Sequence, residues 1–106
     1  MKQPPKFIRA VDEKTGRIFI FRTRNPAYFG EVFEFDNEIK ALELSVNYPC
    51  GSRAWHNGKH YVFILNRFLD PIDKPETQTE ADELARLLRR AIDWYIQAII
   101  KKEDLK

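Results

Sequence analysis

Hydrophobic and polar residues alternate along much of the first two thirds of the chain, a pattern that is typical of half-buried β-strands. The segments 6–11 and 17–24 are rich in aromatic and β-branched residues and flank the turn-forming residues 12–16, so they predict a β-hairpin. Pro26 then interrupts the pattern, because proline has no N–H to donate within a central strand. A third strand is predicted over residues 28–35.

A fourth strand is predicted over residues 41–48, where apolar residues occupy the even positions and small or polar residues the odd ones. This period of two is the clearest strand signal in the chain. A second hairpin is predicted from residues 52–55 and 59–66, because the intervening Asn57 and Gly58 form a dipeptide that strongly favours a tight turn. The sheet is therefore expected to contain five or six strands.

The C-terminal third predicts a single amphipathic helix over residues 77–102, after a proline-containing linker at 70–76. Thr77 and Glu80 have the spacing of a capping box, and acidic residues in the first turn suit the positive end of a helix. The apolar residues recur at helical spacing and form one stripe, comprising Leu84, Leu88, Ala91, Ile92, Tyr95, Ala98 and Ile99. This stripe predicts that the helix packs on the sheet.

These elements predict an α+β fold, in which an antiparallel β-sheet of five or six strands carries one long C-terminal α-helix packed on one face. The length of 106 residues suits a single domain with one hydrophobic core. Residues 1–5 are expected to form a flexible N-terminal tail, and residues 6–69 the sheet.

Cys50 is the only cysteine, so no disulfide can form within the chain. Residues 1–6 lack the apolar core of a signal peptide, and no segment approaches the roughly 18 consecutive apolar residues of a membrane span. Both features favour a soluble protein in a reducing compartment, and the cytoplasm is the expected location.

The formal net charge is only +2, but positive charge is concentrated in the predicted sheet. Residues 1–69 contain eleven Lys or Arg and seven Asp or Glu, which sum to +4, whereas residues 70–106 contain seven and nine, which sum to −2. Any attraction for an anionic partner therefore belongs to the sheet.

Successive side chains of a strand point to opposite faces, and the predicted strands sort their residues by type into two sets. One set is aliphatic and consists of Ile8, Ala10, Ile18, Ile20, Val32, Leu42, Leu44, Val46, Ala54, Val62 and Ile64. The other set combines aromatic residues and arginines, namely Phe7, Arg9, Arg17, Phe19, Phe21, Phe33, Phe35, Arg53, Trp55, Tyr61 and Phe63. The aliphatic set better matches the apolar stripe of the helix, so the aromatic set is expected to form the open face.

The register of the second hairpin decides whether the two sets stay apart. A two-residue turn at 57–58 pairs Trp55 with His60 and mixes the sets, whereas a three-residue loop pairs Trp55 with Lys59. Only the second register keeps the aromatic residues on one face, and the predicted binding surface depends on it.

An open face of rings and guanidinium groups predicts a protein that binds single-stranded nucleic acid. Aromatic rings stack on unpaired bases with about 1–3 kcal/mol per base, and basic side chains attract phosphates. Both single-stranded DNA and RNA fit this chemistry. The candidate nucleic-acid-binding residues are Phe7, Arg9, Arg17, Phe19, Phe21, Arg22, Arg24, Arg53, Trp55, Lys59, Tyr61 and Phe63.

The same aromatic face is also typical of a small protein-interaction module, a regulator or inhibitor that docks on a protein partner. A homodimer belongs to the same interpretation, formed either through this face or through the C-terminal helix, where Trp94 lies at the edge of the apolar stripe. Binding of a small molecule is a third interpretation. Burial of Trp94 against the sheet of its own domain is the alternative for this residue.

No metal, cofactor or catalytic group is expected. Cys50, His56 and His60 are potential zinc ligands, but a structural zinc site usually takes four ligands and no fourth is evident. The same side chains lack the third group that orients a catalytic nucleophile and base. No glycine-rich phosphate-binding motif or zinc-protease motif occurs, so the chain is not predicted to be an enzyme.

Overall fold

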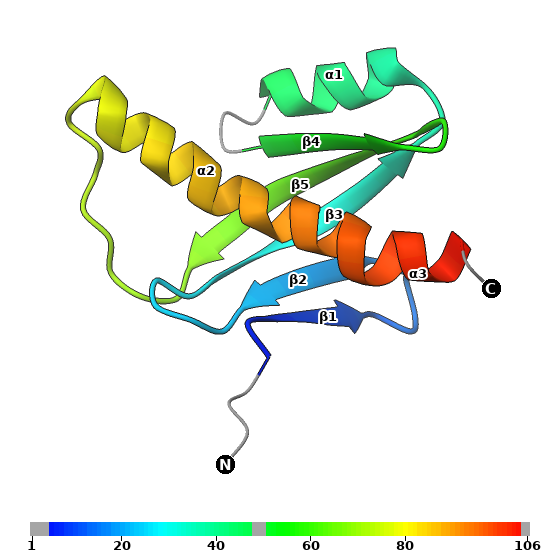
Figure 1. Cartoon of the computed structure of the whole chain (residues 1–106), viewed down its shortest axis with the longest axis horizontal. Coiled ribbons are helices and arrows are strands. Elements are labelled where there is room, and N and C mark those ends of the chain that lie inside the picture. The colour runs from blue at the N-terminus through cyan, green and yellow to red at the C-terminus, as the bar shows by residue number, and fades with distance from the viewer. Residues whose placement is uncertain (1–4, 48–50, 105–106) are drawn as a thin grey trace.

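The computed structural model describes residues 5–47 and 51–104. Five strands form one antiparallel sheet in the order β1-β2-β3-β5-β4. The strands are β1 (Phe7–Val11), β2 (Ile18–Arg22), β3 (Tyr28–Phe35), β4 (Gly51–His56) and β5 (Lys59–Phe68). The helices are α1 (Glu38–Asn47), α2 (Gln78–Tyr95), a π-helical turn η1 (Ile96–Ile100) and α3 (Lys101–Asp104). The predicted α+β class, with an antiparallel sheet and a long C-terminal helix, is confirmed (Figure 1).

The first hairpin follows the prediction. Asp12 begins the turn between β1 and β2, and its Oδ1 accepts hydrogen bonds from the backbone N–H groups of Lys14 (2.9 Å) and Thr15 (3.4 Å). Gly16 ends the turn with a φ of 74°, a conformation in which residues with a Cβ are strained. Short polar side chains and glycine therefore determine this turn locally.

The observed register of the second hairpin divides the predicted aromatic residues between the two faces of the sheet. Asn57 and Gly58 both have positive φ, 49° and 79°, which defines a two-residue turn whose twist matches that of the flanking strands. Trp55 consequently lies opposite His60, and Ala54 lies opposite Tyr61. The three-residue loop on which the single aromatic face depended is wrong.

The strand predicted over residues 41–48 is also wrong, because Glu38–Asn47 form helix α1. Asn37 caps this helix, since its Oδ1 accepts hydrogen bonds from the N–H groups of Ile39 (2.7 Å) and Lys40 (3.4 Å). Ala41 is buried and Leu44 is half-buried, and residues three apart lie on the same side of a helix. The apolar residues of this segment therefore fit a helix as well as a strand. Tyr48, the last residue of the predicted strand, lies outside the described residues.

The long C-terminal helix begins as predicted. The N–H of Glu80 donates to Oγ1 of Thr77 (3.1 Å), and the carboxylate of Glu80 accepts a hydrogen bond from the N–H of Glu76 (3.0 Å). Helix α2 crosses one face of the sheet from β4 to β1 (Figure 1). Its buried residues Leu88, Ala91, Ile92 and Tyr95 form one core with Phe7, Ile20, Tyr28, Val32, Tyr61 and Phe63 of the sheet.

This core corrects the expectation that α2 covers only the aliphatic set. Phe7, Tyr61 and Phe63 belong to the aromatic set and are buried beneath the helix. Trp94 is half-buried and stacks on Phe7 with 5.6 Å between the ring centroids, so its partner is the sheet of its own domain. Aromatic rings therefore supply much of the helix-facing core.

Helix α1 packs on the other face of the sheet, near β5 and β4. Val62 points away from α2 and is fully buried, and Ala41 of α1 is 1% exposed. On this face α1 contacts β3, β5 and β4, and Ile8 of β1 remains 44% exposed. The two helices thus lie on opposite faces and leave one region of the sheet open.

Gly30 allows the central strands to approach each other at a β-bulge between β3 and β5. It is buried opposite Ile20, and a Cβ built on it would lie 2.6 Å from Cζ of Phe63 and closer still to the carbonyl oxygen of Ile64. The ring of Phe63 therefore occupies the space that a side chain at position 30 would need.

We predict that Gly30→Ala destabilises the protein by about 1–3 kcal/mol, the usual cost of overpacking a core. Gly16→Asn is the control, because a side chain there meets open space and asparagine tolerates a positive φ. Urea unfolding followed by circular dichroism measures both changes. Equal stabilities of the two variants would contradict this account of Gly30.

Tyr28 links the sheet to α2, because its hydroxyl donates a hydrogen bond to the carbonyl of Leu87 at 2.7 Å. Burial raises the pKa of Tyr28 from the ordinary 10.0 to about 12. The stability that the neutral hydroxyl contributes is complete below pH 10 and is lost as the pH rises towards about 12.

We predict that Tyr28→Phe lowers the free energy of unfolding at neutral pH by about 0.5–1.5 kcal/mol, the net value of one hydrogen bond. The variant should also lose less stability than the wild type between pH 10 and 12, because the raised pKa is absent. Urea midpoints across this range test both statements. An unchanged pH dependence would show that Tyr28 is not the group that titrates.

Candidate functional site

The structure divides the twelve predicted nucleic-acid-binding residues between the two faces of the sheet. Six point towards the α2 side, namely Phe7, Arg9, Arg22, Lys59, Tyr61 and Phe63. Five lie on the opposite side, namely Arg17, Phe19, Phe21, Arg53 and Trp55. Arg24 follows the end of β2. A single platform made of all twelve residues therefore does not exist.

The three rings on the α2 side are not available for stacking. Phe7, Tyr61 and Phe63 are at most 5% exposed, because α2 covers them. Two of the cations on this side have acidic partners: Arg9 lies 3.6 Å from Glu103, and Lys59 lies 2.8 Å from Glu34. The hydrogen bond and the charge of Glu34 raise the pKa of Lys59. These residues stabilise the fold.

A phenylalanine face lies on the open side of β1, β2 and β3 and consists of Ile8, Phe19, Phe21, Phe29 and Phe33. Phe21 and Phe29 are opposite each other in the register and stack with 5.1 Å between their centroids and 14° between their planes. All four rings are half-buried, because each packs against its neighbours on the sheet. The ion pair of Arg17 and Glu31 lies among these rings, because Glu31 is opposite Phe19 and between Phe29 and Phe33 on β3.

Two arginines lie beside the phenylalanine face, and one of them is neutralised by a carboxylate. Arg17 makes two hydrogen bonds to Glu31, from Nη2 (2.6 Å) and from Nε (3.0 Å), and its guanidinium group lies 5.2 Å from the Phe19 ring. The hydrogen bond to Glu31, and then the charge of this carboxylate, raise the pKa of Arg17. Arg67 lies 5.9 Å from the ring of Phe29. Arg17 thus offers little free charge to a phosphate.

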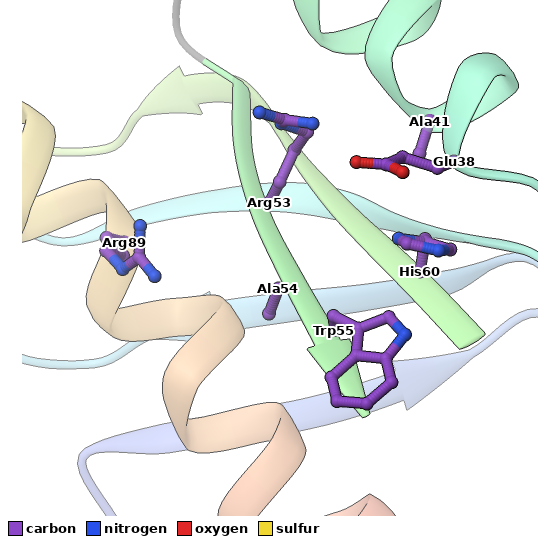
Figure 2. Close-up of a pocket in the computed structure, with 7 residues that line it drawn as sticks. All are labelled: Glu38, Ala41, Arg53, Ala54, Trp55, His60 and Arg89. Atoms are coloured by element: carbon purple, nitrogen blue, oxygen red, sulfur yellow. The ribbon is translucent and has the colours of Figure 1, made fainter. Parts of the chain in front are cut away.

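A second surface, the β4-edge groove, runs along the outer side of β4 between α1 and α2. One hollow of about 440 Å³ is lined by Glu38, Ala41, Arg53, Ala54, Trp55, His60 and Arg89 (Figure 2). An adjoining hollow of about 510 Å³ is lined by Ser45, Ser52, Arg53, Ala85, Arg86 and Arg89. Because the two hollows share Arg53 and Arg89, they form one groove.

The hairpin register and the two helices position the side chains of this groove. Arg53 and Trp55 alternate along β4 and point to the α1 side together with His60, whereas Ala54 points towards α2 (Figure 2). Trp55 is 64% exposed, the only exposed aromatic side chain among residues 5–47 and 51–104. Its indole is therefore open to a planar ligand.

Positive charge predominates in the β4-edge groove. It contains three arginines, Arg53, Arg86 and Arg89, against the single lining carboxylate of Glu38. Arg89 also lies 3.8 Å from Asp93, with both side chains exposed. Sequence analysis identified Arg53 but not Arg86 or Arg89, because only the packing of α2 beside β4 brings the helix arginines to the groove.

The potential metal ligands do not converge. His56 and His60 lie on opposite faces of the sheet in the observed register, and Cys50 is outside the described residues. Within the part of the chain that the structure describes, no three His, Cys, Asp or Glu side chains are grouped as metal ligands would be. The predictions that the protein has no cofactor and is not an enzyme stay predictions.

The chain matches no protein-family model, and comparisons with curated proteins and with solved structures find no similar protein. No helix in the described ranges is both long enough and apolar enough to cross a membrane. The functional inference therefore rests on the two surfaces described above.

Proposed function

We propose that the protein binds single-stranded nucleic acid along the β4-edge groove. The observation that carries this proposal is an exposed indole, Trp55, beside three guanidinium groups in one groove. An unpaired base stacks on Trp55, and Arg53, Arg86 and Arg89 neutralise the neighbouring phosphates. Neither contact reads the 2′-hydroxyl, so the proposal includes both DNA and RNA.

The dimensions and accessibility of the groove support this assignment. The two hollows, of about 440 and 510 Å³, are within the usual range of ligand sites, about 300–1,000 Å³. A base has to leave its partner strand before it can stack on a side chain, so the groove favours single strands over duplexes. The phenylalanine face is less suitable, because its rings are half-buried and Arg17 is already bound to Glu31.

We predict that Trp55→Ala weakens oligonucleotide binding by about 1–3 kcal/mol, the value of one stacked base. Arg53→Ala should reduce the slope of log affinity against log salt by about 0.7, the value expected for one lost phosphate contact with a single strand. Fluorescence anisotropy of a labelled oligonucleotide, measured at several salt concentrations, gives both quantities.

Phe19→Ala is the matched control, because it removes a ring from the phenylalanine face and leaves the β4-edge groove intact. It should not change the affinity for the oligonucleotide. The proposal fails if no oligonucleotide binds at low salt or if a duplex binds more tightly. If Phe19→Ala weakens binding and Trp55→Ala does not, the binding surface lies on the phenylalanine face.

The second candidate function is protein interaction through the phenylalanine face, with a second copy of the chain as the partner. The specific observation in its favour is that four phenylalanines gather on this face and that the charge of Arg17 beside them is neutralised by Glu31. Contiguous exposed apolar surface commonly marks protein interfaces. Two copies of one face can meet around a two-fold axis.

We predict that the wild type is a dimer in sedimentation equilibrium and that Phe21→Asp is a folded monomer, because a carboxylate in an apolar interface is desolvated without a partner. Circular dichroism verifies that the variant is folded. Trp55→Asp, on the other surface, should remain dimeric. A monomeric wild type at every accessible concentration would exclude the homodimer.

A further inference from the structure

Arg22, the last residue of β2, is a buried cation on the α2 side of the sheet. It is 6% exposed, and its Nε and Nη1 atoms have no hydrogen-bond partner among the described residues. Buried guanidinium groups are normally paired, since an unpaired buried charge is strongly destabilising. A ligand that supplies negative charge would resolve this imbalance.

The surroundings of Arg22 hold its side chain in place. In the register of the sheet it lies between Phe7 on β1 and Tyr28 on β3, and its guanidinium carbon is 5.8 Å from the centroid of the Phe7 ring. Tyr28 is in turn fixed to α2 by its hydrogen bond to Leu87. The guanidinium group is therefore preorganised.

Arg90 of α2 lies close to the same position. Tyr28 contacts the helix at Leu87, and Phe7 contacts it at Trp94. Arg90 is between these two contacts along α2, so the helix places it near the strand position that Arg22 occupies between Phe7 and Tyr28. Its side chain is exposed.

Lys6, the residue before β1, also lies near Arg22 and Arg90. The N–H of Thr23 donates to the carbonyl of Lys6 (2.9 Å), and the hydroxyl of Thr23 donates to the carbonyl of Pro5 (2.5 Å). These bonds hold the chain before β1 against the end of β2. Loss of solvation, and then the charges of Arg22, Arg90 and Arg24, lower the pKa of Lys6.

Four cations thus gather in an Arg22 corner that consists of Lys6, Arg22, Arg24 and Arg90. Within the described residues, Lys6, Arg22 and Arg90 form no salt bridge. This distinguishes them from Arg9, Arg17 and Lys59, each of which has an acidic partner. Lys6, Arg22 and Arg90 therefore give the corner positive charge that no salt bridge within the described residues neutralises.

We propose that the Arg22 corner binds a phosphate group. A phosphate carries up to two negative charges and several acceptor oxygens, which match a buried guanidinium group and three exposed cations better than a single carboxylate does. Arg22 forms the base of the site, and Lys6, Arg24 and Arg90 lie at its solvent side. The phosphate is either a free anion or the terminal phosphate of a nucleotide or oligonucleotide. The site is independent of the β4-edge groove.

The test uses the full chain and inorganic phosphate as the probe. Phosphate should raise the melting temperature more than sodium chloride of equal ionic strength does, because it binds the folded state. Arg90→Gln and Lys6→Gln should each weaken phosphate binding about tenfold in isothermal titration calorimetry, as expected for the loss of one charge-assisted contact. Both side chains are exposed, so both variants are expected to fold even if Arg22→Gln does not.

Arg67→Gln is the matched control, because it removes an exposed arginine of β5 that belongs neither to the Arg22 corner nor to the β4-edge groove. It should bind phosphate as the wild type does, and so should Trp55→Ala, which separates this proposal from the nucleic-acid one. Tighter binding of a 5′-phosphorylated oligonucleotide than of its 5′-hydroxyl form identifies a nucleic-acid end as the source, and equal binding identifies a free phosphate. Phosphate that stabilises no more than chloride does, or equal binding by Arg90→Gln, Lys6→Gln and wild type, would overturn the proposal.

Discussion

The two-residue turn at Asn57 and Gly58 determines which side chains of the sheet meet α2. Because both residues adopt a positive φ, β4 and β5 pair with Trp55 opposite His60. This register turns Tyr61 and Phe63 into the core beneath the helix. It turns Arg53 and Trp55 outwards. A shift of one residue would exchange these sets, so the hydrophobic core and the β4-edge groove depend on the same turn.

Helix α1 then separates what remains of the open side of the sheet into two chemically different surfaces. Ala41 of α1 and Val62 of β5 are both buried on that side, where the helix packs against the strand. On β1, β2 and β3 the surface consists mainly of phenylalanine side chains, and its Arg17 is bound to Glu31. At β4 the exposed surface combines one indole with three guanidinium groups. An aromatic and basic sheet suggests two functions, binding to nucleic acid and binding to protein. Each of these functions fits a different part of the molecule.

The sequence allowed prediction of those features that local chemistry determines. Asp12 and Gly16 specify the first turn, and Thr77 with Glu80 specifies the start of α2, because in each case neighbouring residues make the decisive hydrogen bonds. Helix α1 was not predictable from alternation, since its apolar residues fit a period of two as well as a helical turn. The groove was only half predictable, because Arg86 and Arg89 contribute to it through the packing of α2. Burial of Arg22 has no signal in the sequence, since arginine is usually exposed.

The net charge of the chain is small, but its cations differ in whether they have a carboxylate partner. Arg9, Arg17 and Lys59 each face a carboxylate, so they add little to the field around the molecule. Arg53 and Arg86 of the β4-edge groove and Lys6, Arg22 and Arg90 of the Arg22 corner form no such salt bridge within the described residues. Their strand residues lie towards opposite edges of the sheet, Arg53 on the outermost strand β4 and Arg22 on β2 beside β1, whereas Arg89 and Arg90 are consecutive residues of α2. A long anionic chain bound at one edge is thus not required to contact the other. Anion binding at the β4-edge groove and anion binding at the Arg22 corner can therefore be tested separately.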